Sequence, residues 1–197
     1  STTGCEGGML ATNDRALWLR AWAYKDHGKS WEAVPERARG PGFRWLHESF
    51  GSNFRMTEMQ AAIGRVQLRK LERWVGQRRR NAAALAGALR GLPGLRVPMP
   101  GADSVHSCYK LYAQLDPACL REGWTVQRVI VAIEREGVPC FQGGCSEIYR
   151  ERAFLDRGWA PPKPLPVASR LTDTSLMFLV HPTLSEADML EIGRAHV

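Results

Sequence analysis

Apolar positions recur at helical spacing near the start of the chain. One stripe predicts a helix over residues 14–25, capped by Thr12 or Asn13; its apolar members are Leu17, Trp18, Ala21 and Trp22. The tripeptide Asp26-His27-Gly28 ends this helix, since glycine adopts the backbone angles that follow a helix without strain. Residues 29–50 contain prolines and glycines without periodicity, so we expect a long loop there.

A second and longer helical pattern covers residues 57–92. Thr57 and Gln60 form a plausible capping box at its start, and Pro93 stops it. Its apolar stripe comprises Met59, Ile63, Val66, Leu71, Trp74, Val75, Ala82, Leu85, Ala86 and Leu89. Because this length exceeds the usual helix of a compact domain, we expect it to bridge two lobes, with Gly76 at a bend or a change of packing partner.

The second half of the chain alternates expected strands and helices. Strands are predicted over residues 107–115, 138–142 and 175–180. Helices are predicted over residues 125–136, 146–154 and 165–171, and from Ser185 onward. This alternation predicts an α/β lobe that packs helices onto a small sheet.

The composition narrows the class of protein. Of the 197 residues 44% are hydrophobic and 24% charged, as in soluble globular proteins, and no apolar run reaches the ~18 residues of a membrane span. No signal peptide is visible, so a cytoplasmic location is expected.

The net charge, 27 − 20 = +7, attracts anions such as phosphates and sugar nucleotides. The five cysteines contain no CxxC and no histidine pair has ligand spacing, so neither disulfides nor a metal site is expected.

Two segments carry polar residues that can bind an anion. Asn53 and Arg55 precede the long helix, where backbone amides and the helix dipole favour bound phosphate. The structural alternative is that Asn53 caps a turn while Arg55 pairs with Glu58. The glycine segment, residues 2–8 (T-T-G-C-E-G-G), is neither a dinucleotide fingerprint nor a P-loop and can equally be a tight hairpin.

A run of basic residues on the long helix raises a different possibility. Its members fall opposite the apolar stripe, as on a solvated face: Arg65, Arg69, Lys70, Arg73, Arg78, Arg79 and Arg80. A nucleic-acid-binding helix is the rival interpretation. Aromatic side chains that would stack on bases are missing from that face of the helix, Trp74 lying on the apolar side, so the solvated face is favoured.

The glycine segment, His27-Gly28 and residues 51–64 (G-S-N-F-R-M-T-E-M-Q-A-A-I-G) occur in a specific order. Together they resemble the DegT/DnrJ/EryC1/StrS family of sugar aminotransferases, which have the aspartate-aminotransferase fold. That family shows a lysine shortly before a TTGEGG-like run, a helix ending in His-Gly, a loop, and a G-x-N-x-R-M-T-E-x-Q-A-A-I-G segment. The resemblance extends to Val197, and Cys5 is a departure from the commoner pattern.

The resemblance implies an α/β fragment of a fold-type-I enzyme that uses pyridoxal 5'-phosphate. Residues 1–76 would be the end of the cofactor-binding large domain with the bridging helix, and residues 77–197 the small α/β domain. The complete enzyme would transfer an amino group, with glutamate as the expected donor, to a nucleotide-linked keto sugar. The Schiff-base lysine is expected just before Ser1, so no catalytic residue lies in this chain, which alone is expected to be inactive.

The resemblance also implies site residues. Asn53 and Arg55 would reach the cofactor phosphate of a neighbouring subunit, which makes the enzyme a homodimer. His27, Tyr109 and Lys110 would face the substrate, as would the turn of residues 142–145 (Q-G-G-C).

Four alternatives stay open at this point. The chain can belong to an aminotransferase that continues upstream, or to a dehydratase of 4-keto sugars, in which histidine replaces the lysine. It can be a truncated or split chain that only binds a partner. It can also be a basic interaction module without a cofactor.

Overall fold

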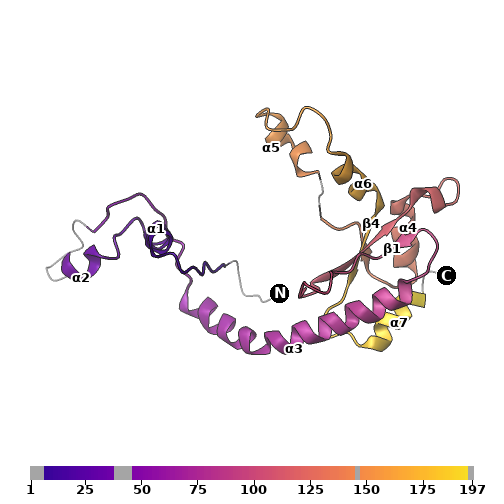
Figure 1. Cartoon of the computed structure of the whole chain (residues 1–197), viewed down its shortest axis with the longest axis horizontal. Helices are drawn as coiled ribbons and strands as arrows, with labels where there is room; N and C mark the ends of the chain where they lie inside the picture. The colour runs from indigo at the N-terminus through magenta and orange to yellow at the C-terminus, as the bar shows by residue number, and fades with distance from the viewer. Residues whose placement is uncertain (1–6, 38–45, 145–146, 195–197) are drawn as a thin grey trace. The chain divides into compact units, whose positions relative to one another are not determined.

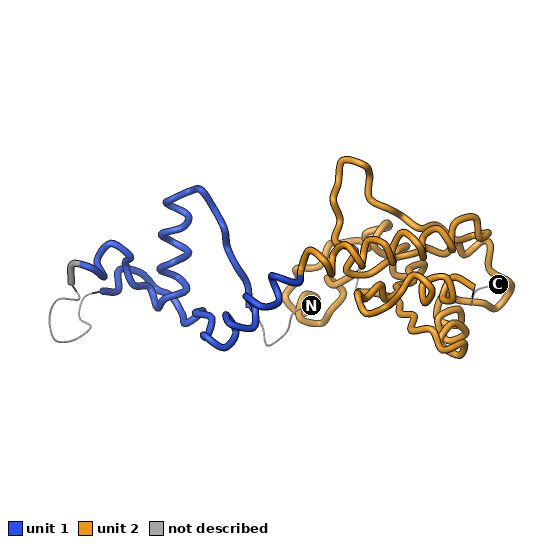
Figure 2. The backbone as a smooth tube through the Cα atoms, turned by 90° about the horizontal axis from the view of Figure 1, so that it is seen from below, with its two compact units in different colours: residues 1–70 blue, residues 71–197 orange. Residues whose placement is uncertain are grey.

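The computed structural model describes residues 7–37, 46–144 and 147–194 (Figure 1). The chain divides into two compact units, Ser1–Lys70 and Leu71–Val197 (Figure 2). The sequence placed a domain boundary between residues 76 and 77, and that boundary stays a prediction. The first five residues of the glycine segment, together with Cys145 of the predicted turn, lie outside the described residues.

Helix α1 (Arg15–Lys25) opens the first unit, close to the predicted helix. Its cap is Asp14, whose carboxylate accepts hydrogen bonds from the backbone amides of Ala16 and Leu17 at 2.8 and 3.1 Å. The expected cap at Thr12 or Asn13 was therefore wrong. The Thr12 hydroxyl instead accepts from the Asp14 amide at 3.1 Å, which fixes the residue that does cap the helix.

A short helix interrupts the segment that the sequence predicted as loop. Helix α2 (Ala33–Arg37) begins after Ser30, whose hydroxyl accepts from the Ala33 amide at 3.3 Å. Pro35 is tolerated because it lies in the first turn, where its missing N–H has no partner to lose. The rings of Trp18 and Trp22 on α1 meet Trp31 edge to face, at centroid distances of 5.2 and 5.0 Å.

Helix α3 (Glu58–Leu89) confirms the long helix (Figure 1). The capping box is formed: the Thr57 amide donates to Gln60 Oε1 at 2.8 Å, and the Gln60 amide donates to Thr57 Oγ1 at 3.3 Å. The helix continues through Gly76 without a break. All its buried residues lie between Arg78 and Leu89, so the packing of the helix does change near Gly76.

The second unit contains an antiparallel four-stranded sheet in the order β1-β2-β4-β3. Its strands are β1 (Leu95–Arg96), β2 (Lys110–Leu115), β3 (Cys140–Phe141) and β4 (Ser175–Leu179). Strands β2 and β4 pair with Leu111 opposite Phe178. The predicted small sheet is thus present, although the two-residue strand β1 had no sequence signal. Strand β2 starts three residues later than expected, after Cys108, whose φ of 49° is left-handed.

One hydrophobic core joins the sheet to three helices, α3, α4 (Val126–Arg135) and α7 (Glu186–Arg194). Its largest fully buried apolar side chains are Phe178, Leu85, Leu89, Leu176 and Met189. These residues come from α3, β4 and α7, and Leu111 and Ile133 add β2 and α4. Burial alternates along β2: Leu111 and Ala113 face the core while Tyr112 stays exposed. Successive side chains of a strand point to opposite faces, so one face of the sheet packs on the core.

A smaller helical segment completes the second unit. It contains the 3-10 helix η2 (Ile148–Arg150) and the helices α5 (Arg152–Leu155) and α6 (Pro166–Thr174). The single helix predicted over residues 146–154 was therefore wrong, because the chain is extended at Glu151 between η2 and α5. Another 3-10 helix, η1 (Pro117–Cys119), follows β2.

Candidate functional site

Two backbone segments of the first unit pair beside the end of α1. The amides of Ser52 and Phe54 donate to the carbonyls of Tyr24 and Lys25, at 2.8 and 3.0 Å. In return the His27 amide donates to the Ser52 carbonyl at 3.1 Å. This pairing sets residue 26 directly opposite residue 53. The segment that ends the first helix and the segment that precedes the long helix thus meet.

Glycine is required at two points of this pairing. A Cβ on Gly28, whose φ is 83°, would lie 1.8 Å from the Ser49 carbonyl oxygen. A Cβ on Gly51 would lie 2.5 Å from the Gly28 nitrogen. No side chain fits at either position without moving the backbone, so these glycines permit the close approach.

His27 occupies the left-handed position that glycine usually takes after a helix. Its φ is 61°, and the Gly28 amide behind it donates to the Ala23 carbonyl at 2.7 Å, as in a Schellman ending. Non-glycine residues with such angles carry backbone strain, which is common at functional sites. The strained backbone holds the imidazole Nε2 3.4 Å from Arg55 Nη2.

The structure brings together three of the predicted site residues. Asn53 Oδ1 accepts from both the backbone amide and the Nε of Arg55, each at 3.3 Å, and His27 contacts the same guanidinium. Asn53 therefore does shape a turn, as the structural alternative proposed. The other half of that alternative was wrong, because Arg55 forms its ion pair with Asp26, at 3.8 Å, and not with Glu58.

Asp26 lies at the centre of a cationic cluster. Its side chain is 11% exposed and has three cationic neighbours: Lys29 Nζ at 3.4 Å, Lys25 Nζ at 3.5 Å and Arg55 Nη1 at 3.8 Å. Burial alone would raise the pKa of Asp26, but the hydrogen bond and charge of Lys29, with the charges of Arg55 and Lys25, hold that pKa below its usual value. Three cations against one carboxylate leave the cluster positively charged.

A groove of about 680 Å³ opens beside this cluster in the first unit. Its walls combine the aromatic rings of Trp18, Trp22 and Phe54 with the cationic side chains of Lys25 and Arg55. Gly7 and Gly8 also line it. Such a groove can accept a ligand that carries both a flat ring and an anionic group.

The amino end of α3 offers fewer anion donors than the sequence suggested. The backbone amides of Thr57 and Gln60 are already used by the capping box. The side-chain cluster around Arg55 is therefore the stronger anion-binding feature of the first unit.

The other two predicted site residues, Tyr109 and Lys110, belong to the second unit. Two cations lie near the Tyr109 ring: Lys110 Nζ at 5.4 Å from its centroid and the Arg78 guanidinium at 5.2 Å. Arg78 Nη1 also donates to the Tyr109 carbonyl at 3.1 Å. Arg78 is buried, so its assignment to a solvated basic face was wrong; it packs beneath Tyr109 instead.

The described part of the predicted turn, residues 142–144, lines a second groove, of about 640 Å³. Gln142 is anchored by a hydrogen bond from its Nε2 to the Thr172 carbonyl. The same groove contains the buried Glu147, which accepts from the hydroxyls of Tyr149 and Ser169, each at 2.7 Å, and from Arg150 at 3.2 Å. Hydrogen bonds from Tyr149 and then Ser169 hold the pKa of Glu147 below its usual value, although burial acts in the opposite direction.

Two residues of these sites had no role in the sequence interpretation. Asp26 was read only as part of a helix ending, and Glu147 was not singled out. An acidic residue at the carboxyl end of a helix opposes the helix dipole, so Asp26 did carry a signal. In the part of the chain that the structure describes, no group of three or more His, Cys, Asp or Glu side chains is arranged to hold a metal ion, and no helix has the length and apolarity to cross a membrane.

Comparison with known proteins assigns the family. The profile of the DegT/DnrJ/EryC1/StrS aminotransferase family matches residues 2–196. The chain belongs to this family. Its members are pyridoxal-phosphate-dependent aminotransferases of fold type I, which confirms the fold class and the cofactor inferred from the sequence.

Similar proteins include enzymes of amino-sugar biosynthesis. The aminotransferase from Psychrobacter cryohalolentis is 47% identical in sequence, with a TM-score of 0.86, over 93% of this chain and 49% of its own. The dTDP-3-amino-3,4,6-trideoxy-alpha-D-glucose transaminase of Streptomyces venezuelae is 33% identical over 51% of this chain and 24% of its own. The erythromycin biosynthesis sensory transduction protein EryC1 of Saccharopolyspora erythraea is 28% identical over 91% of this chain and 43% of its own. The chain thus spans less than half the length of these relatives.

Proposed function

We propose that this chain belongs to a pyridoxal-phosphate-dependent aminotransferase that acts on a nucleotide-linked keto sugar. It would supply the small domain and the residues that bind the cofactor phosphate, Asn53 and Arg55. The observation that carries the proposal is the contact between Asn53, Arg55 and His27 inside a positively charged cluster. A guanidinium and an amide together suit a phosphate dianion, because charge-assisted hydrogen bonds to phosphate are strong and directional.

The residues of this chain fit one end of the cofactor. Arg55 would donate to the phosphate through its guanidinium and Asn53 through its Nδ2 group, in the active site of a neighbouring subunit. The bound cofactor would supply an electron sink for amino-group transfer. The lysine that would bind it and move the proton is proposed to lie upstream of Ser1, because none of the chain's own lysines occupies the family position, so the chain alone would be inactive.

Substrate contacts are proposed in each unit separately. In the first unit, His27 is proposed to orient the sugar nucleotide beside Arg55. In the second unit, Tyr109 and Lys110 are proposed as substrate-binding residues. The cationic surroundings of Tyr109 suit an anionic nucleotide. Glutamate is the proposed amino donor, since its carboxylates also suit a positively charged site.

A partner surface is also part of the proposal. The first turns of α3 expose an apolar face in this chain, including Met59 at 77%, Ile63 at 42% and Val66 at 46% exposure. Contiguous apolar surface of this kind is usually covered in the assembled protein. We propose that the upstream part of the polypeptide and a second subunit cover it, giving a homodimer with Asn53 and Arg55 acting in trans.

The substitution Asn53→Ala in the enzyme that contains this chain tests the phosphate role. We expect about 10- to 100-fold weaker cofactor binding, since a hydrogen bond to a charged group is lost. Mixing this variant with a subunit that lacks the upstream lysine should restore part of the activity, because one intact shared site re-forms. Gln114→Ala, which also removes an amide side chain but one that contacts Arg96 in the second unit, is the control. Cofactor affinity that is unchanged in Asn53→Ala would rule out the phosphate role.

The sequence upstream of Ser1 in the enzyme that contains this chain distinguishes the remaining alternatives. A lysine a few residues upstream of Ser1 supports amino transfer, whereas a histidine there supports sugar dehydration. If no upstream segment exists, the chain is a binding module. Salt-sensitive binding of generic DNA that ignores the cofactor would instead favour the basic interaction module.

A further inference from the structure

Asp26 occupies a position that is unfavourable for an acidic side chain in two respects, and it lies beside a strained residue. It follows the last turn of α1, where the negative end of the helix dipole opposes a carboxylate. Its side chain is 11% exposed, so the carboxylate has lost most of its hydration. Its neighbour His27 is held at a left-handed φ of 61°. Several local rules broken at one place are typical of a functional site.

The surroundings of Asp26 explain how the carboxylate is tolerated. Lys25 and Lys29 come from its own segment, and Arg55 comes from the segment that pairs with it. Two lysines already satisfy the electrostatic requirement of one carboxylate. The third contact, to Arg55, is therefore not needed to neutralise Asp26, which points to a role of Asp26 toward Arg55.

Arg55 needs such an anchor. Its side chain is 49% exposed, and an exposed arginine samples many rotamers unless hydrogen bonds restrict it. Three groups contact its guanidinium: Asn53 Oδ1 accepts from Nε at 3.3 Å, His27 Nε2 lies 3.4 Å from Nη2, and Asp26 Oδ1 forms an ion pair with Nη1 at 3.8 Å, longer than a hydrogen bond. Only the Asp26 contact carries a full opposite charge.

We propose that Asp26 is a positioning residue that fixes the Arg55 guanidinium for phosphate binding. This deepens the proposed function and rests on the phosphate role of Arg55. Asp26 itself does not touch the phosphate, which it would repel. Its effect on affinity is the balance between ordering Arg55 and weakening the local positive charge, and ordering dominates.

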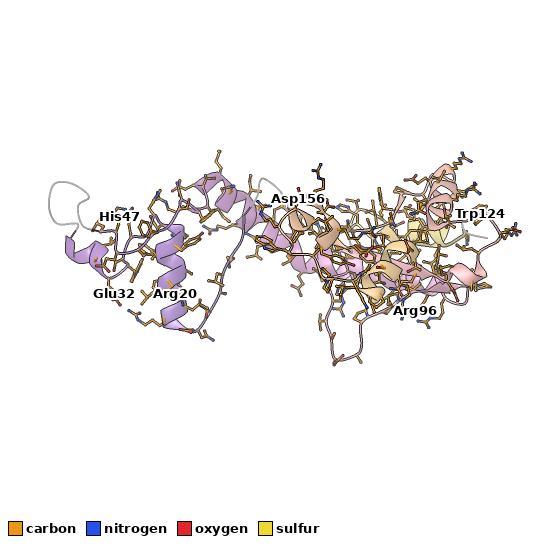
Figure 3. All side chains as sticks on the ribbon, turned by 90° about the horizontal axis from the view of Figure 1, so that it is seen from above. Arg20, Glu32, His47, Arg96, Trp124 and Asp156 are labelled. Atoms are coloured by element: carbon orange, nitrogen blue, oxygen red, sulfur yellow. The ribbon has the colours of Figure 1, made fainter. Side chains whose placement is uncertain are left out.

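The substitution Asp26→Asn tests this balance because the two effects have opposite signs. Loss of the anchor should weaken cofactor binding about two- to fivefold in the enzyme that contains this chain, because an ion pair of a half-exposed side chain contributes little. Loss of the negative charge alone would tighten it. Asp26→Glu should recover part of the affinity. Glu32→Gln is the matched control, because Glu32 (labelled in Figure 3) pairs with Arg15 at 3.1 Å in the same unit, and its replacement removes the same charge without touching Arg55.

A second readout does not require the cofactor. The Nε–H resonance of Arg55, assigned by its loss in Arg55→Lys, should move toward the value of a solvated arginine in Asp26→Asn and stay in place in Glu32→Gln. If Asp26→Asn does not fold, the unmodified chain still decides the matter. On acidification, the Arg55 Nε–H signal should then shift with the same midpoint as the Asp26 carboxyl carbon.

The outcomes separate the two proposals. An Asp26→Asn enzyme that binds the cofactor as tightly as the parent or more tightly overturns the positioning role. So does an Arg55 resonance that ignores the state of Asp26. If instead Arg55→Ala leaves cofactor affinity unchanged, the proposed function is wrong, while the resonance measurement still reports on positioning.

Discussion

Asn81 is the fully buried polar side chain that ties α3 to the chain before α7. Its Nδ2 group donates to the carbonyls of His181 and Leu184, at 3.0 and 2.9 Å, and its Oδ1 accepts from Gln77 at 2.8 Å. The Asn81 side chain is fully buried, whereas its hydrogen-bond partners belong to residues that are partly or fully exposed. Replacing Asn81 by alanine therefore removes the donor from two carbonyl groups at the edge of the core.

The expected magnitude follows from those two carbonyls. A hydrogen bond contributes about 1 kcal/mol net, so loss of the two bonds to these carbonyls in Asn81→Ala should destabilise the second unit by roughly 2 kcal/mol. A domain of this size is stable by only about 5–15 kcal/mol. The variant should thus lose a large part of its stability, although Asn81 is far in sequence from the loop that it holds.

Hydrogen exchange of the β4 amides measures this effect directly. These amides lie in the core of the sheet and exchange through opening of the second unit, so a loss of 2 kcal/mol should accelerate them roughly 30-fold. Arg79→Ala, an exposed position on the same turn of α3, is the control and should stay within about 0.5 kcal/mol. Equal exchange in Asn81→Ala and the parent would refute the assigned role of these hydrogen bonds.

Two further predictions concern titrating groups. Because burial raises the pKa of Cys140 to about 11, only about 0.1% is thiolate at pH 8, so iodoacetamide should label the exposed Cys119 and spare Cys140 in peptide mapping of the native chain. Equal labelling of the two would contradict this. The pKa of Glu147 is depressed by folding, so its stabilising effect is present above the unfolded value of 4.5 and is lost as the pH falls below it. Melting temperatures of Glu147→Gln and the parent should differ most at pH 7 and converge at acidic pH; a constant difference would refute the reasoning.

Elements with a long periodic signal were predictable from the sequence. Helix α3 and its capping box follow from the spacing of apolar residues and from Thr57 and Gln60, and they agree with the structure. Strand β4 was also predicted, because its apolar run is buried on both faces. Hydrophobic periodicity reflects the burial of one whole face of an element. It therefore predicts helices and strands that pack along their full length.

Short elements depended on contacts that no local pattern records. Strand β1 has two residues and exists because Leu95 pairs with Leu115. Helix α2 depends on the Ser30 cap within a segment that reads as loop. Such elements are specified by their partners in space, which a single sequence does not reveal.

The candidate site was predictable in part. Asn53, Arg55 and His27 followed from the family pattern, and the structure brings them within hydrogen-bonding range. The contact between Asp26 and Arg55 was not visible, because it arises only when the segments carrying these two residues pair. Burial of Arg78 was missed for a related reason: helical spacing separates faces of a helix but does not identify which face another element covers.

The continuity of α3 restricts how this protein can be divided. The boundary between the units falls at Lys70, inside an unbroken helix, so no flexible linker is available there for a protease or for recombination to cut. A chain cleaved at that point would begin with four unpaired amide groups. An autonomous carboxyl-terminal module should therefore start at Thr57, where the helix supplies its own cap. Recombination can then exchange this module only together with the whole of α3.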